Sequence, residues 1–342
     1  MQLSDFNYVL PEKRIAQFPP AERGKAKLLV LDRYSGTIVH QQYPDLINYL
    51  QPNDVVVLNN TKVIKARLNV KNQAGQDREL LLLEHHAHDS DNRRHKALYH
   101  GHLREGESLM IQTSKITVEK IIGNGVVEVY SRDNLLKLAE KSGTVPLPPY
   151  MKRAASEQDV ERYQTEFAKK AGSVAAPTAS LNFTDALRKQ LEAKGIIVVN
   201  LTLHVGLGTF LPIRVNDLTQ HKIHSEYFEI PATTVEAIQK AKQTGFKVTA
   251  MGTTVTRTLE FAALKILNDR PQDLLGEADI FIYPGYTFQV VDHLLTNFHA
   301  PKSTVLLMAA AFAGWQNLRL AYEEALNNDY QFLSYGDSMF IL

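Results

Sequence analysis

A histidine and two glycines follow one apolar segment closely, and this is where we expect chemistry. Residues 196–199 form a β-branched run typical of a buried strand. His204 follows, with an imidazole that exchanges protons near neutral pH, and Gly206 and Gly208 let a ligand approach the backbone. Because ligands of open α/β sheets bind at the carboxyl ends of strands, this stretch is a candidate catalytic loop. The alternative is a tight turn beside a hydrogen-bonded core histidine.

A second strand end carries groups that suit an anion. The strand predicted over 246–251 ends in Gly252, Thr253 and Thr254, and a helix is predicted to follow. Backbone N–H groups at a helix N-terminus bind carboxylate or phosphate, and Arg257 adds a planar fork of donors. Ordinary capping explains the threonines but leaves the arginine unexplained.

Small polar residues follow other apolar segments. Asn59 and Asn60 come after the strand predicted over 54–58, where they either close a turn or recognise the polar edge of a ligand. Thr178 lies in a run of small residues, 172–183, that lets another segment or a ligand approach closely. Several such loops at one sheet edge predict a pocket there.

Histidine-containing segments raise the question of a metal. His221, His224 and Glu226 are of suitable types, but the sequence shows neither oriented ligands nor their outer hydrogen bonds. We therefore expect no metal and assign this segment a proton-transfer or hydrogen-bonding role, since the aromatic residues after Glu226 favour a raised carboxyl pKa. The absence of cysteine excludes thiolate sites. A second cluster, predicted to be a solvated loop, comprises His85, His86, His88 and His95.

Nucleic acid would require a local binding patch. With 38 basic and 37 acidic residues, the net charge of +1 attracts no polyanion overall. In the proline-rich segment 144–153, Tyr150 with Lys152 and Arg153 would suit a stacked base beside a phosphate. The alternative is a rigid linker between domains.

Chain length and strand spacing predict two domains. A chain of 342 residues is long for one core. Between residues 67 and 145, short strands separated by turns predict an inserted antiparallel β-barrel domain. The flanking parts, 1–66 and 146–342, alternate strands and helices and predict a discontinuous α/β domain, whose mainly parallel or mixed sheet has flanking helices. Within it we expect a helix over 156–170 and a strand over 278–283.

Nothing in the sequence predicts export or a membrane span. The first ten residues lack a basic segment followed by an apolar one, so no secretory signal is expected. The longest apolar run, 305–313, is too short to cross a bilayer. We expect a cytoplasmic protein.

Short motifs along nearly the whole chain give it a family resemblance. The sequence resembles the S-adenosylmethionine:tRNA ribosyltransferase-isomerase family of queuosine biosynthesis. No single string is specific, but their number and order are. The strings are LNNTKVI at 58–64, VPLPPY at 145–150, AAPTA at 175–179, LHVGLGTF at 203–210, HSEY at 224–227, GTT at 252–254, YPG at 283–285, NFH at 297–299 and YGD at 335–337.

The resemblance implies an α/β domain with an inserted β-barrel, and a reaction. The family transfers the ribosyl part of S-adenosylmethionine to the aminomethyl group of 7-aminomethyl-7-deazaguanine in tRNA, giving epoxyqueuosine and releasing adenine and methionine. S-adenosylmethionine is thus a substrate, and no separate cofactor is expected. The expected partner is tRNA bearing 7-aminomethyl-7-deazaguanine, and the enzyme is expected to be a monomer.

Residue types assign roles in this reaction. A base must remove a proton next to the sulfonium, and an acid must assist the departing adenine. His204, Glu226 and His299 are the predicted catalytic residues. The predicted substrate-binding residues are Asn59, Asn60, Thr178, Gly206, Gly208, His224, Thr253, Thr254 and Arg257, and the predicted tRNA-binding residues are Tyr150, Lys152 and Arg153.

Five positions depart from the family pattern. Lys65 replaces a proline, Ser180 a glycine and Asn182 a histidine, while Val255 and Thr256 replace Ser-Val. An amide does not titrate, so Asn182 cannot serve as acid or base. Two hypotheses follow: an active ribosyltransferase-isomerase, or a divergent non-catalytic paralogue that binds tRNA or S-adenosylmethionine. An ordinary methyltransferase is disfavoured because no G-x-G-x-x-G loop follows the first strand.

Overall fold

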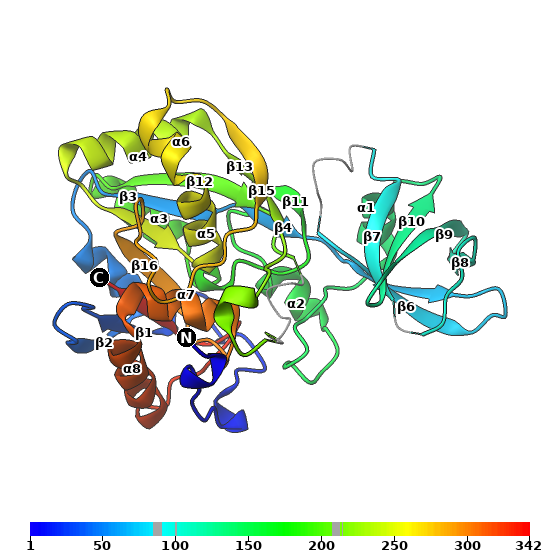
Figure 1. Cartoon of the computed structure of the whole chain (residues 1–342), viewed down its shortest axis with the longest axis horizontal. Helices are drawn as coiled ribbons and strands as arrows, with labels where there is room; N and C mark the ends of the chain where they lie inside the picture. The colour runs from blue at the N-terminus through cyan, green and yellow to red at the C-terminus, as the bar shows by residue number, and fades with distance from the viewer. Residues whose placement is uncertain (85–90, 100, 207–212, 214) are drawn as a thin grey trace.

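A large α/β body and a smaller β-barrel make up the molecule (Figure 1). The structure is a computed structural model that describes residues 1–84, 91–99, 101–206, 213 and 215–342. Both bodies match the predicted fold class, a mixed α/β sheet with an inserted antiparallel barrel.

The barrel closes from six antiparallel strands in the order β10-β7-β6-β5-β8-β9. Alternate residues along these strands are buried, and they form a separate apolar core. A short helix, α1, follows the last strand and begins where the Asn134 side chain accepts the Lys137 N–H. The barrel elements are β5 (Arg67–Lys71), β6 (Asp77–Leu82), β7 (Arg94–Tyr99), β8 (Ser108–Ile111), β9 (Ser114–Gly123), β10 (Val126–Ser131) and α1 (Leu135–Ser142).

A nine-stranded mixed sheet forms the centre of the α/β body, in the order β15-β13-β12-β3-β14-β16-β17-β1-β2. Its middle strands β12, β3, β14 and β16 run parallel to one another. β3 is buried along its whole length, as expected for a strand covered on both faces. The strands are β1 (Lys27–Leu31), β2 (Ile38–Gln42), β3 (Val55–Asn59), β12 (Ile197–Leu203), β13 (Glu226–Ile230), β14 (Val248–Met251), β15 (Leu274–Ala278), β16 (His293–Asn297) and β17 (Ser338–Ile341).

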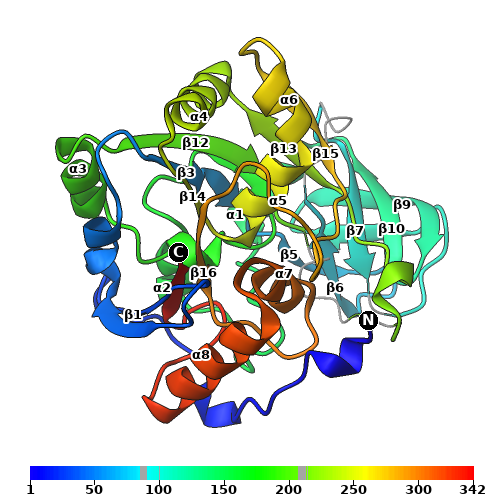
Figure 2. The same cartoon turned by 60° about the vertical axis from the view of Figure 1, so that its left-hand side comes forward.

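Helices cover both faces of this sheet (Figure 2). One face carries α4, α5, α6, α7 and α8 around the largest core, and the other carries α3 with the 3-10 segment 43–49. No helix among the described residues is long and apolar enough to cross a membrane. The helices are α2 (Glu157–Arg162), α3 (Asp185–Ala193), α4 (Ala232–Thr244), α5 (Thr253–Phe261), α6 (Ala263–Asn268), α7 (Thr304–Ala313) and α8 (Trp315–Asn327).

Two predicted elements differ from the structure. The helix expected over 156–170 stops at Arg162, and the chain then forms β11 (Lys170–Ser173), which pairs with β4 (Thr61–Val63). The strand expected over 278–283 lies earlier, because β15 ends at Ala278 and the apolar residues after it pack against the core without strand pairing. Apolar content alone could not distinguish a paired strand from an apolar segment that packs against the core without pairing.

Candidate active site

The predicted loops meet at one edge of the sheet. The parallel strands β3, β12, β14 and β16 end there, followed by Asn60, His204, Gly252 and Phe298 respectively. From β3 the sheet continues to β12 on one side and to β14 on the other, so this edge is a topological switch point. Such a point is where open α/β sheets bind ligands.

Two adjoining cavities lie at this edge. The larger has a volume of about 460 Å³, within the range of small-molecule sites. Thr178, Asn297 and His299 supply polar groups to its wall, and Tyr150 supplies an aromatic ring. The smaller, of about 20 Å³, has room for little more than one water-sized group. Thr253, Thr254 and Val305 line both cavities.

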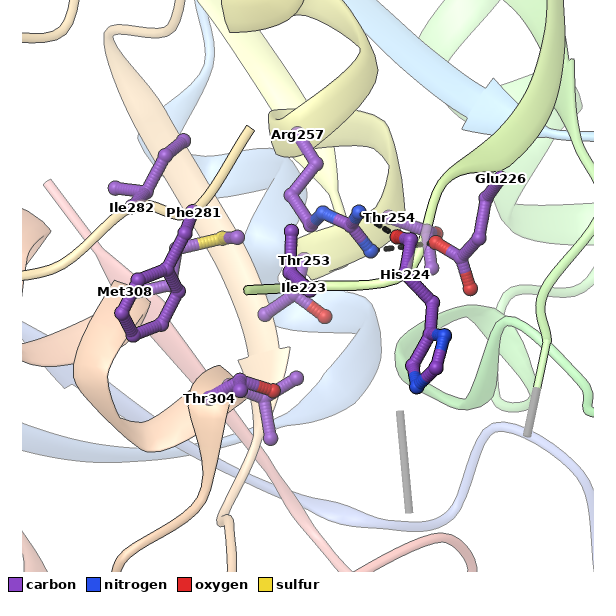
Figure 3. A pocket seen from close by; sticks show the side chains of 11 residues that line it. Ile223, His224, Glu226, Thr253, Thr254, Arg257, Phe281, Ile282, Thr304 and Met308 are labelled. Carbon is purple, nitrogen blue, oxygen red and sulfur yellow. Dashed lines mark hydrogen bonds and ion pairs between the residues drawn. The ribbon is translucent and has the colours of Figure 1, made fainter. Parts of the chain in front are cut away.

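The smaller cavity has charged side chains on one side and apolar side chains on the other (Figure 3). Arg257 and Glu226 point toward each other on one side, with His224 near them. Phe281 and Met308 form the opposite wall. The cavity therefore presents a positive group and apolar surface to the same ligand.

Unpaired donors face the region that the two cavities share. Helix α5 begins after Gly252, whose positive φ of 107° suits glycine, and no side chain caps the helix. The first turn's earliest internal bond runs from the Thr256 N–H to the Gly252 carbonyl. The N–H groups of Thr253 and Thr254 have no acceptor in the described part of the chain, so the helix N-terminus can hold an anion.

The ion pair beside them is buried. Arg257 Nη1 donates to Glu226 Oε2 at 2.5 Å, and Nη2 donates to the carbonyls of Ala278 and His224 at 3.2 and 3.4 Å. Arg257 Nε is also buried but has no acceptor among the described residues. The other oxygen of Glu226 accepts the Gly206 N–H at 2.8 Å. Glu226 is thus held between a guanidinium and a backbone amide.

His299 lines the larger cavity and is held firmly. Its Nε2 is 2.7 Å from the Thr296 hydroxyl. Its backbone N–H donates to the Tyr322 hydroxyl at 2.9 Å, and its carbonyl accepts from the Tyr8 hydroxyl. Burial lowers the pKa of His299 to about 3, so its imidazole is neutral at physiological pH.

His204 and the two asparagines lie behind the cavities and line neither of them. His204 Nδ1 is 2.8 Å from the Thr61 hydroxyl. The Asn59 amide donates to the Leu203 carbonyl and accepts the Leu203 N–H, which ties β3 to β12. Asn60 Oδ1 accepts the Thr202 hydroxyl at 2.7 Å. The contacts seen here hold the strand ends together.

Asn297 is a cavity residue that residue-type reasoning did not select. Its Oδ1 accepts a hydrogen bond from the Thr178 hydroxyl at 2.8 Å. The predicted residue Thr178 and the unpredicted residue Asn297 therefore form one polar group on the cavity wall. The available signal was its position after an apolar pair, Leu294-Leu295, in β16. The predicted residue Gly208 lies outside the described residues, as do His85, His86 and His88.

The three predicted tRNA-binding residues have different surroundings. Tyr150 forms part of the larger cavity's wall, its hydroxyl bonded to Ser334, and burial raises its pKa to about 12. Lys152 is exposed and pairs with Glu12 at 2.6 Å. Arg153 is committed to Asp159, which accepts two of its N–H groups at 2.6 and 2.8 Å.

The five departures from the family pattern are not among the residues that line the two cavities. Asn182 is buried against the N-terminal segment, where its Oδ1 accepts the Gly24 N–H at 3.3 Å. Lys65 pairs with Glu140 near the barrel. Ser180, Val255 and Thr256 are buried in the α/β body. None of the five lines either cavity.

No group of three or more potential metal-binding His, Asp or Glu side chains is assembled in the described part of the chain. His221 instead packs its ring against Phe281 at 4.8 Å. His95 is buried within the barrel core rather than in the solvated loop predicted for it. Its position on β7, where alternate side chains point inward, accounts for this difference.

Comparisons with known proteins agree over the full length. Residues 3–341 match the family described as queuosine biosynthesis protein. A Chlorobaculum parvum protein named S-adenosylmethionine:tRNA ribosyltransferase-isomerase is 53% identical over all of both chains, and one of that name from Geotalea uraniireducens is 42% identical, also over all of both. A crystal structure of S-adenosylmethionine tRNA ribosyltransferase from Thermotoga maritima is 31% identical, with a TM-score of 0.57 over 99% of this chain and 100% of that one.

Proposed function

The chain belongs to the S-adenosylmethionine:tRNA ribosyltransferase-isomerase family of queuosine biosynthesis, and from this membership we propose how its cavities serve the reaction. The protein is an enzyme that moves the ribosyl part of S-adenosylmethionine to tRNA. We propose that the acceptor is 7-aminomethyl-7-deazaguanine, and that epoxyqueuosine-tRNA, adenine and methionine are the products. We further propose a cytoplasmic monomer that needs no separate cofactor.

The proposal rests on the hydrogen-bond donors where the two cavities adjoin, at the N-terminus of α5 and at Arg257. The carboxylate of the methionine part of S-adenosylmethionine would accept hydrogen bonds from the Thr253 and Thr254 N–H groups and from Arg257 Nε, the donors left unpaired there. The adenosyl part would extend into the larger cavity beside the Tyr150 ring. Each of these three donors would thereby gain an anionic acceptor.

His299 is the predicted acid–base residue that lines the larger cavity. Because its imidazole is neutral, it can accept the proton next to the sulfonium. Its lowered pKa makes the neutral ring a weak base and the protonated ring a strong acid, so the proton that it accepts passes readily to the departing adenine. Glu226 has both oxygens occupied and His204 lines neither cavity, so neither is given a proton-transfer step.

The test is a single incubation with S-adenosylmethionine and tRNA carrying 7-aminomethyl-7-deazaguanine. Mass spectrometry should find adenine, methionine and the modified nucleoside in equal amounts. His299→Gln should lower kcat by about 10²–10⁴-fold while changing the affinity for S-adenosylmethionine by less than about 3-fold. His40→Gln is the matched control and should retain activity, because His40 is an exposed residue of the edge strand β2.

Two outcomes would count against the proposal. If both substrates bind but no product forms, the chain is a non-catalytic paralogue. If products form and H299Q retains the wild-type kcat, the proton transfers belong to another residue.

A further inference from the structure

One carboxylate from the barrel reaches the catalytic edge of the α/β sheet. Glu84 follows β6 directly after Leu83, whose N–H still donates to the Lys96 carbonyl of β7 at 2.8 Å. Glu84 is therefore fixed to the barrel ladder by its neighbour. Its side chain is buried and lies against Gly206, at the end of β12.

Gly206 has no room for a side chain because of Glu84. A Cβ on Gly206 would lie 2.5 Å from Glu84 Cδ and Oε1, and 2.7 Å from Oε2. Contacts this short do not occur in real structures, so either the buried Glu84 carboxylate or the backbone at Gly206 would have to shift. The φ angle of Gly206 lies outside the left-handed region, so alanine is allowed there by the backbone. The glycine is needed for space alone.

Gly206 connects this contact to the ion pair at the smaller cavity. Its N–H donates to Glu226 Oε1 at 2.8 Å, and Glu226 Oε2 accepts from Arg257 at 2.5 Å. On its other side, Val205 lines the larger cavity and its N–H donates to the Ser173 hydroxyl at 2.8 Å. A displacement of Gly206 would therefore move Glu226 and the guanidinium that it holds.

We propose that Glu84 is a positioning residue that the barrel contributes to the catalytic domain: its carboxylate holds Gly206 against Glu226, and Glu226 holds Arg257 at the smaller cavity. The placement of the barrel thus sets the geometry of the site that takes the carboxylate of S-adenosylmethionine, an inference that rests on the proposed function for that ligand.

A rescue experiment tests the contact. Gly206→Ala should raise both the Kd for S-adenosylmethionine, measured with unmodified tRNA present, and its KM by about 10- to 100-fold, the cost of overpacking a tight site. Glu84→Ala removes the obstructing carboxyl, so E84A/G206A should return to within about 3-fold of E84A alone. Glu84→Gln keeps the side-chain volume, so E84Q/G206A should stay as impaired as G206A.

A matched control separates this contact from a general effect. Gly276→Ala adds a Cβ near the Phe228 ring on the edge strand β15, and no Glu84 atom is among those nearest to that Cβ. The effects of G276A and E84A should therefore multiply independently. If G206A fails to fold, recovery of folding in E84A/G206A supports the same contact.

Some results would contradict the positioning role of Glu84, and others would contradict the proposed function. Wild-type affinity in G206A, independent effects of G206A and E84A, or equal rescue by E84A and E84Q would each overturn the inference. Coupling seen in the Kd without any ribosyl transfer would refute the proposed function and leave the inference standing. Transfer without coupling would refute the inference alone.

Discussion

Two buried arginine–carboxylate pairs hold different parts of the molecule, and they differ in how many of their donors are used. Asp159 accepts two N–H groups of Arg153, and the third guanidinium nitrogen donates to the Gln17 carbonyl at 2.8 Å. The Tyr335 hydroxyl also donates to Asp159 at 2.7 Å. In the Arg257–Glu226 pair, Arg257 Nε remains without an acceptor among the described residues, although the side chain is only 7% exposed.

This difference separates a pair that stabilises the fold from a pair that can bind a ligand. A fully hydrogen-bonded pair has nothing left to offer, whereas a buried unused donor at a cavity wall costs stability until something accepts from it. The Arg153–Asp159 pair joins the proline-rich segment to α2 and the N-terminal segment. The Arg257–Glu226 pair joins α5 to β13 at the cavity edge.

Asp159→Asn should give the largest change in stability. Asp159 is 1% exposed, and the substitution leaves the Arg153 guanidinium, whose side chain is 17% exposed, without its counter-ion. We expect the free energy of unfolding to fall by about 3–5 kcal/mol, with the KM for S-adenosylmethionine unchanged in the folded fraction. Urea denaturation and steady-state kinetics measure the two quantities, and a raised KM at wild-type stability would contradict the distinction between the pairs.

The same pair should make stability depend on pH. Burial raises the pKa of Asp159, but hydrogen bonds from Arg153, Ser156 and Tyr335 outweigh this and hold the pKa well below its usual value. A lowered folded-state pKa stabilises the protein above the unfolded value near 3.9 and loses that contribution as the pH falls below it. The stability difference between wild type and D159N should therefore shrink from pH 6 to pH 2.5. A constant difference would show that the charge of Asp159 contributes nothing.

Sequence reasoning located the strand ends but not the use of each side chain there. The order of apolar segments and turns was sufficient for the barrel, whose strands bury alternate residues, and for β3, β12 and β14, whose short apolar runs mark strands of the central sheet. It was insufficient for Arg153 and Arg257, which have the same chemistry in sequence and differ only in which acceptors the fold brings to them. Asn297 was missed because its short strand, β16, begins at the polar residue His293, directly after Asp292, and was not recognised.

Arg257→Lys should affect binding more than folding. Lysine keeps the positive charge beside Glu226 but lacks the Nε donor and the planar fork. We expect the KM for S-adenosylmethionine to rise by about 10- to 100-fold, or about 1.4–2.7 kcal/mol, with kcat within a few-fold of wild type. D159N is the control, since it perturbs the other pair. Equal KM values for R257K and wild type would place the carboxylate elsewhere.

Asn182→His should produce the smallest change in activity, although it restores the residue of the family pattern. Asn182 lies in the packed interior, because its side chain is 4% exposed and its Oδ1 accepts the Gly24 N–H. The imidazole would be larger than the amide in a filled site, so the free energy of unfolding should fall by about 1–3 kcal/mol.

The rate itself should change by less than about 3-fold in N182H, because neither cavity includes position 182. A thermal melt and a kcat measurement on the folded fraction distinguish the two effects. A gain in kcat of tenfold or more would mean that a titratable group at this position reaches the reacting atoms. The region around Asn182 and Gly24 would then be part of the active site. A loss of stability at constant kcat would instead show that position 182 serves packing in this chain, where Asn182 accepts the Gly24 N–H.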